Sequence, residues 1–177
     1  MLKFSRFYPS DYERGQDFMA DLDKFLAQLP KGRSYAVDMR NHNWLEPDYF
    51  ACLACYGVTH VFNSWEAMPP VGEQMMLPGS QTNPTLTAAR FLLKPGRKYE
   101  EAVKTFAPYD RVQEKDDKAR AAGAKLIAAG AVSAGKKKTY IYVNNRLYTA
   151  RGIKPVMPPP TLCRAASWNS AISTRTL

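Results

Sequence analysis

Short runs of β-branched and aromatic residues alternate with helical patterns along the first 147 residues, and this alternation constrains the fold most. Strands that alternate with helices are typical of βαβ units, in which successive strands lie parallel in one sheet. The pattern therefore predicts an α/β protein with about five parallel strands. The expected strands cover residues 2–7, 34–40, 58–62, 86–93 and 138–143.

Four helical segments are expected between these strands, at residues 15–29, 47–56, 99–105 and 117–134. The first shows the clearest stripe, because Phe18, Leu22, Phe25 and Leu26 recur at helical spacing. The Pro- and Gly-rich segment 68–84 is too long for a plain connector, so a binding loop or lid is expected there. After residue 147 the hydrophobic residues follow neither the period of a strand nor that of a helix, so residues 148–177 are expected to form an irregular tail.

Composition places the chain among soluble intracellular proteins. Its 177 residues, 45% of them hydrophobic, are enough for one domain with a core of its own. No apolar run approaches the roughly 20 residues that span a bilayer, and the N-terminus does not resemble a secretory signal. Three cysteines without such a signal favour a reducing, cytoplasmic setting.

The net charge of +9 is spread over the chain. Residues 1–147 hold all 16 acidic and 21 of the 25 basic residues, which leaves them at +5, and the tail adds +4. A positive balance favours anionic partners in general. The only basic cluster, Lys136–Lys138, is more typical of a solvated turn than of a nucleic-acid site.

Polar side chains stand at the C-terminal ends of two expected strands. Asp38 and Arg40 alternate onto one face of the run YAVDMRNHNWL, and Asn144 and Asn145 close the run TYIYVNN. Parallel strands direct such ends toward one ligand crevice. The two asparagines are therefore candidate binding residues, with a cap of the last βα turn as the alternative. Asp38 is the candidate acid/base, with a structural ion pair to Arg40 as its alternative. Arg90 interrupts an apolar strand and needs an anion, which Asp38 could supply as well as a substrate phosphate.

Other motifs give weaker signals. Cys52 and Cys55 match C-x-x-C, but they lie in an apolar helical segment, so buried small residues are expected and no metal bound by them. The segment 130–137, GAVSAGKK, lacks the final Ser or Thr and the preceding strand of a phosphate-binding loop. His42 could carry a proton, but an exposed loop histidine is the more common case.

The motifs VDMRNHNW, VTHVFNS, ARFLLKPGRKYEEAV and YIYVNN occur in an order that resembles the YecE-like family, the bacterial domain of unknown function 72. The resemblance covers about residues 1–147 and implies a TIM-barrel-like (β/α) fold without a firmly attached activity. It also implies that the first half of the barrel is missing here, so the chain is expected to be a truncated domain. Five strands cannot close an eight-stranded barrel. The bare outer strands are therefore expected to favour self-association.

Two departures from the resembled family affect the candidate site. The family commonly has an acid where this chain has Asn63, so Asn63 is retained only as a candidate binding residue. After residue 147 the sequence YTARGIKPVMPPP does not continue the family pattern, which suggests a shifted reading frame or a foreign junction. Trp44 is also included among the candidate binding residues, although packing is more common for such a side chain.

Three functional hypotheses follow. The first is an enzyme, such as a hydrolase or isomerase, that acts on a small polar or anionic substrate at the C-terminal rim of the strands. The second is a non-catalytic nucleic-acid-binding protein that uses the basic surface. The third is an inactive truncated fragment. The sequence names no cofactor and does not decide whether the protein is an enzyme.

Overall fold

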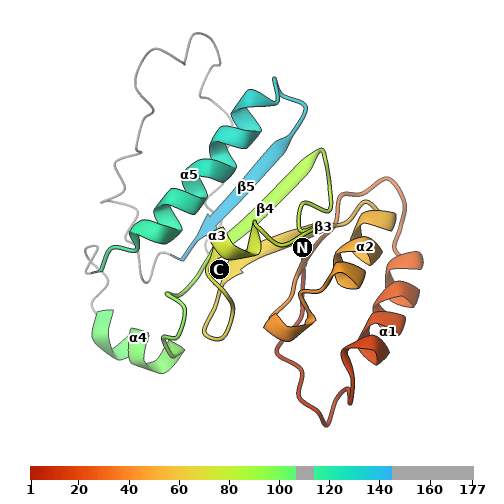
Figure 1. Cartoon of the computed structure of the whole chain (residues 1–177), viewed down its shortest axis with the longest axis horizontal. Coiled ribbons are helices and arrows are strands. Elements are labelled where there is room, and N and C mark those ends of the chain that lie inside the picture. Colours follow the sequence, from red (N-terminus) through yellow and green to blue (C-terminus); the bar gives the residue numbers. More distant parts are fainter. Residues whose placement is uncertain (107–113, 145–177) are drawn as a thin grey trace.

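The described part of the chain forms one parallel sheet in the order β1-β2-β3-β4-β5 (Figure 1). The computed structural model describes residues 1–106 and 114–144. All four strand pairs are parallel, which confirms the predicted α/β class and five-stranded sheet. The strands are β1 (Leu2–Lys3), β2 (Ala36–Asp38), β3 (Thr59–Ser64), β4 (Leu86–Phe91) and β5 (Lys138–Val143).

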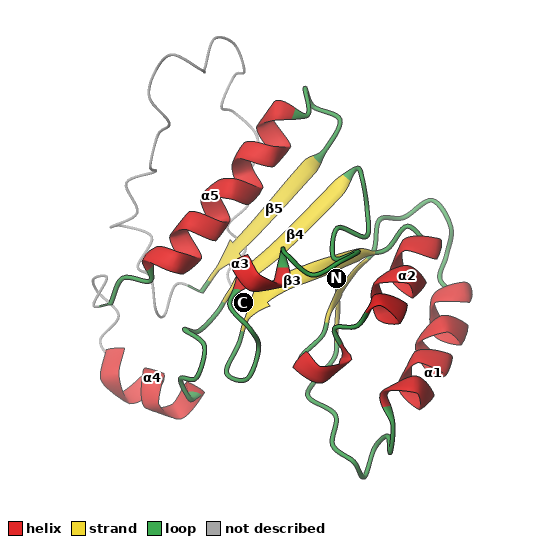
Figure 2. Ribbon diagram, in the orientation of Figure 1, coloured by secondary structure: helices red, strands yellow, loops and turns green. Residues whose placement is uncertain are grey.

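Within the described residues, five helices and a 3₁₀ turn connect the strands. Figure 2 distinguishes the helices, in red, from the strands, in yellow. They are α1 (Gly15–Ala27), the turn η1 (His42–Trp44), α2 (Pro47–Cys55), α3 (Val71–Gln74), α4 (Tyr99–Phe106) and α5 (Asp117–Val132). Local sequence sets several of their ends. Pro47 occupies the first turn of α2, and Gly57 follows α2 at a φ of +63° that favours glycine. The Asp116 side chain caps α5 by accepting a hydrogen bond from the Ala119 N–H at 2.9 Å.

One face of the sheet is covered by helices and holds most of the core. Val37 and Met39 of the β2 segment pack with buried residues of α1 and α2, and Phe62, Ala89 and Phe91 pack with residues of α3 and α5. The contributing helix residues are Phe18, Leu22, Leu26, Tyr49, Phe50, Leu53, Val71, Ala122 and Leu126. Burial of such side chains, at roughly 25 cal/mol per Å² of apolar area, is the main force that keeps the helices on this face.

The opposite face has a much smaller apolar cluster, made of Ala36, Val61 and Ala88. Alternation along the strands places Asp38, beyond Ala36, and Arg90, beyond Ala88, on this same face. Asp38 and Arg90 therefore lie on the face opposite the helices. We call this surface the inner face.

The long segment 68–84 is anchored to the rest of the fold. It contains α3, and its Thr82 hydroxyl donates to the Val58 carbonyl at 2.7 Å and accepts from the His60 N–H at 2.8 Å. Met68 and Val71 are buried in the core. The expectation of a lid is therefore wrong for this segment, because its buried bonds tie it to β3.

Two strand edges remain unpaired within residues 1–106 and 114–144, namely the outer edges of β1 and β5. An exposed edge offers unpaired backbone groups to another chain, so self-association stays a prediction. The expected domain boundary near residue 147 and the tail lie outside the described residues. Within the described ranges, no helix has the length and apolar character required to cross a bilayer.

Candidate functional site

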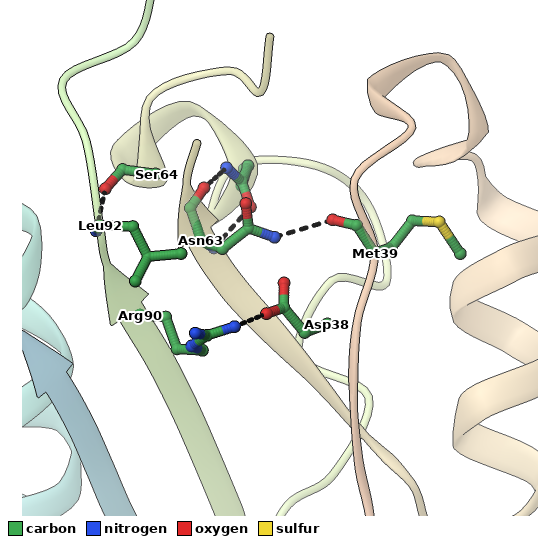
Figure 3. A network of polar contacts seen from close by, with 7 residues as sticks. Asp38, Met39, Asn63, Ser64, Arg90 and Leu92 are labelled. Carbon is green, nitrogen blue, oxygen red and sulfur yellow. Dashed lines mark hydrogen bonds and ion pairs between the residues drawn. The ribbon is translucent and has the colours of Figure 1, made fainter. Parts of the chain in front are cut away.

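An ion pair joins β2 to β4 on the inner face. Figure 3 shows the Arg90 guanidinium, through Nη1, directed at Oδ2 of Asp38. The Asp38 side chain is fully buried and that of Arg90 is 18% exposed. The prediction that Asp38 could supply the anion for Arg90 is confirmed, although 52 residues separate the two in the sequence. The alternative of an Asp38–Arg40 ion pair is wrong, since the carboxylate of Asp38 pairs with Arg90.

Arg40 lies beside this pair without a carboxylate of its own. Its guanidinium carbon lies 4.0 Å from the centroid of the Trp65 ring, which is a close cation–π contact. Its buried Nε has no hydrogen-bond partner, and no described residue forms an ion pair with it. Burial lowers the pKa of Arg40, the Asp38 carboxylate raises it, and the neighbouring Arg90 charge lowers it further. The Asp38 carboxylate therefore influences two guanidinium groups but forms an ion pair with Arg90 alone.

Asn63 joins the ends of β2 and β3 instead of facing open space. Its side chain is fully buried, and Nδ2 donates to the Met39 carbonyl at 2.8 Å. The Gln74 side chain accepts from the Asn63 N–H at 3.2 Å and donates to the Asn63 carbonyl at 2.6 Å. Only Oδ1 of Asn63 is without a hydrogen-bond partner. The amide thus acts first as a link between two strand ends.

Asn144 stands at the end of β5, as expected. Its N–H donates to the Phe91 carbonyl at 2.9 Å, which continues the β4–β5 ladder by one residue. The parallel arrangement puts this strand end at the same edge of the sheet as the ends of β2, β3 and β4. Asn145 lies outside the described residues.

Trp44 is not brought to the inner face. Its ring stacks on Phe18 at a centroid distance of 4.8 Å and on Phe7 at 5.6 Å, and it also contacts Tyr12. The structure therefore places Trp44 in the packing role that was its alternative. His42 is exposed in the turn before it, as a surface histidine would be.

Two site residues escape the sequence reasoning. Trp65 follows Asn63 by two positions and therefore lies on the same face of the β3 segment. Alternation did not identify Trp65, because the strand was expected to end at residue 62. Gln74 had no signal, because it lies on the short helix α3 within the presumed loop. Its Nε2 also donates to the Pro69 carbonyl at 2.6 Å.

The remaining motifs do not form sites. Cys52 is partly buried but Cys55 is exposed, so the expectation that both are buried is wrong for Cys55, which lies in the last turn of α2. Gly130, the first residue of the GAVSAGKK segment, lies in α5, where a Cβ would collide with the Thr139 hydroxyl. Its helix precedes a strand, the reverse of a phosphate-binding loop. Among the described residues, no three His, Cys, Asp or Glu side chains are grouped to hold a metal.

The similarity of this chain to known proteins shows its family. The sequence profile described as protein of unknown function DUF72 matches residues 4–156. The chain belongs to the DUF72 family. This is the family that the motif order resembles under its YecE-like name, so that resemblance is confirmed. A search of the curated proteins gives no match.

Among solved structures, the chain is similar to a DUF72 family protein from Enterococcus faecalis V583. In one crystal structure of that protein the identity is 18% and the TM-score 0.51, over 82% of this chain and 51% of the other. A second crystal structure of it gives 15% identity and a TM-score of 0.44, over 80% and 51%. The described chain thus spans about half the length of this relative. The likeness concerns the fold, an incomplete TIM-barrel-like arrangement of five parallel strands flanked by helices.

Proposed function

We propose that the inner face binds the anionic group of a small polar substrate at the C-terminal ends of β2, β3 and β4. The observation that carries this proposal is the unpaired charge of Arg40. Its guanidinium is partly desolvated against Trp65, and Asp38 is already engaged by Arg90. A partly buried cation without a counter-ion is unfavourable, and a bound phosphate or carboxylate would supply one.

Each residue has a proposed role in this site. Arg40 and Arg90 hold the anion, and Asp38 orients Arg90 through Oδ2. Asp38 is the proposed acid/base of a hydrolase or isomerase reaction, through Oδ1, which is buried and has no hydrogen-bond partner. Asn144 and Asn145 would orient hydroxyl groups of the substrate, and Asn63, which is buried, would support the site by joining the ends of β2 and β3.

A titration with inorganic pyrophosphate tests the site. Loss of one charged side chain weakens the binding of an anion about tenfold or more. Arg40→Gln should therefore reduce the affinity for pyrophosphate by at least that factor, as measured by isothermal titration calorimetry. Lys136→Gln is the matched control, because it also removes one positive charge but lies before β5, at the other end of that strand. Equal losses of pyrophosphate affinity in the two variants would show that only net charge matters, and the site would be rejected.

Nucleic-acid binding is the second candidate, favoured by the exposed lysines 136 and 138 and by the net charge of +9. Phosphate-backbone binding weakens steeply between about 50 and 200 mM salt. A single-stranded oligonucleotide whose affinity falls in this way, and which Lys136–Lys138→Gln abolishes while Arg40→Gln does not, would replace the first proposal. A chain that binds neither probe would match the third hypothesis, a protein without activity of its own.

We also propose that copies of the chain associate through the unpaired edges of β1 and β5. The β5 edge supports this best, since Tyr142 and Val143 at its end are about half exposed. Sedimentation velocity should show a mass that rises with protein concentration. A single monomeric species over a hundredfold range of concentration, together with a cooperative thermal transition, would contradict it.

A further inference from the structure

Two tyrosines lie side by side on the exposed part of the inner face. Tyr140 and Tyr142 occupy alternate positions of β5, and their side chains are 48% and 50% exposed. The strand register sets Tyr140 beside Ala88 and Tyr142 directly beside Arg90. The tyrosines therefore continue, on the neighbouring strand, the surface on which the arginine pair lies.

The exposure of these rings is unusual for a sheet. Aromatic side chains bury large areas in most folds, because that burial stabilises the chain. Here the neighbour of Tyr140 is the small Ala88, which leaves the tyrosine ring uncovered, and the helices pack on the other face. Two adjacent aromatic rings beside a guanidinium are the elements with which proteins hold a flat, negatively charged ligand.

We propose that the ligand of the inner face carries an aromatic heterocycle as well as its anionic group, as a mononucleotide does. The ring stacks on Tyr140 and Tyr142, and the phosphate is held by Arg90 and Arg40. This inference rests on the proposed anion site and names its substrate class. Charge complementarity supports it, because two guanidinium groups and one carboxylate leave the site with one excess positive charge.

The spacing of the elements suits such a molecule. Alternate residues of a strand are about 6.6 Å apart and paired residues on adjacent strands about 4.8 Å. Aromatic rings interact favourably at centroid distances of about 4.5–7 Å. One heterocycle can therefore contact both tyrosines while its phosphate reaches the neighbouring Arg90. A second copy of the chain is a poorer occupant, since joining two inner faces would bring their arginine pairs together.

Calorimetric titration with adenosine monophosphate (AMP), inorganic phosphate and adenosine tests the inference. Stacking of one base on aromatic side chains should make AMP bind roughly five- to a hundredfold tighter than phosphate. The double variant Tyr140→Leu/Tyr142→Leu should remove this advantage and leave phosphate affinity unchanged, which also shows that the variant is folded. Tyr140→Phe/Tyr142→Phe keeps the rings and should retain the advantage. Tyr56→Leu, an exposed tyrosine that ends α2, is the matched control.

The outcomes separate the two proposals. Equal affinities for AMP and phosphate, or an AMP advantage that survives in the leucine variant, would overturn the heterocycle inference and leave the anion site intact. Failure of phosphate and AMP to bind at all would overturn both. An oligonucleotide of about eight deoxyadenosines that binds more than tenfold tighter per nucleotide than AMP, with a steep salt dependence, would assign the tyrosines to nucleic acid instead.

Discussion

The two ends of the sheet carry positive charge in opposite ways. At the C-terminal end, Arg40 and Arg90 are partly buried, and Arg90 pairs with the fully buried Asp38. At the N-terminal end of β5, lysines 136 and 138 are exposed, and Lys137 reaches only the Gln81 side chain at 3.1 Å. The first cluster is held by the fold, whereas the second is largely surrounded by solvent.

This difference decides which cluster is a candidate site. Exposed charges are screened over about 8–10 Å at physiological salt, and their pairs contribute about 1 kcal/mol or less. Partly desolvated charges interact more strongly, and an unpaired one demands a partner. Residue counts would rank the three consecutive lysines above two separated arginines. Burial reverses that ranking, and the following experiments test the reversal.

The largest effect is expected from removing the buried carboxylate of Asp38. Asp38→Asn leaves Arg90 without its counter-charge, which should lower the free energy of unfolding by about 3 kcal/mol in urea denaturation. Asp17→Asn is the control, because its pair with Arg14 is exposed and solvent screens it, so its loss should be much smaller. Equal losses in the two variants would show that burial does not distinguish the pairs.

The pH dependence of the free energy of unfolding gives a reference from the helix-covered face, where the buried titratable group is the neutral His60. Burial lowers the pKa of His60 to about 3, below the value near 6.5 of an unfolded histidine. Below pH 6.5 the unfolded chain takes up a proton that the folded chain excludes. Stability should therefore be complete above pH 6.5 and fall by about 1.4 kcal/mol per pH unit toward pH 3. His60→Gln should remove this contribution to the slope.

A smaller loss of stability is expected from replacing Asn63, whose neutral amide joins the C-terminal ends of β2 and β3. Asn63→Ala removes the hydrogen bond to the Met39 carbonyl, which should lower the free energy of unfolding by about 1–2 kcal/mol. Chemical denaturation measures it, with the exposed Asn43→Ala as the control for side-chain type. A loss below that of the control would mean that Asn63 does not join the ends of β2 and β3.

The smallest effect should come from the lysine cluster. Replacing Lys136, Lys137 and Lys138 together by Gln should change the free energy of unfolding by less than about 0.5 kcal/mol per residue, since surface substitutions rarely do more. Pyrophosphate affinity should fall less than twofold at 150 mM salt, because the remaining charge effect is screened. A loss as large as that in Arg40→Gln would move the anion site to the N-terminal end of β5.

The elements were largely predictable, because each depends on residues close in the sequence. All five strands lie where period-two and β-branched patterns predict them, and β5 has the predicted bounds. Strand β1 is shorter than expected. Its continuation is held instead by Asn41, whose side chain accepts from the Phe7 N–H and donates to the Phe7 carbonyl, both at 2.9 Å. A side chain 34 residues away thus replaces the ladder, and no local pattern reveals it.

The candidate site was only partly predictable for the same reason. Strand-end reasoning found Asp38, Arg40 and Arg90 but could not choose which arginine the carboxylate would take. It also included Trp44, which the aromatic contacts of α1 keep away from the inner face, and it missed Trp65.

The sequence alone determined the class of fold. When strand and helix patterns alternate, a parallel sheet covered by helices buries the apolar residues of both the strands and the helices. Tertiary structure decided the electrostatics. Charges acquire their strength from depth and distance, and these depend on how strands that are separated by dozens of residues align. The register that puts Tyr142 beside Arg90, and the burial of Asp38, exist only once the sheet has formed.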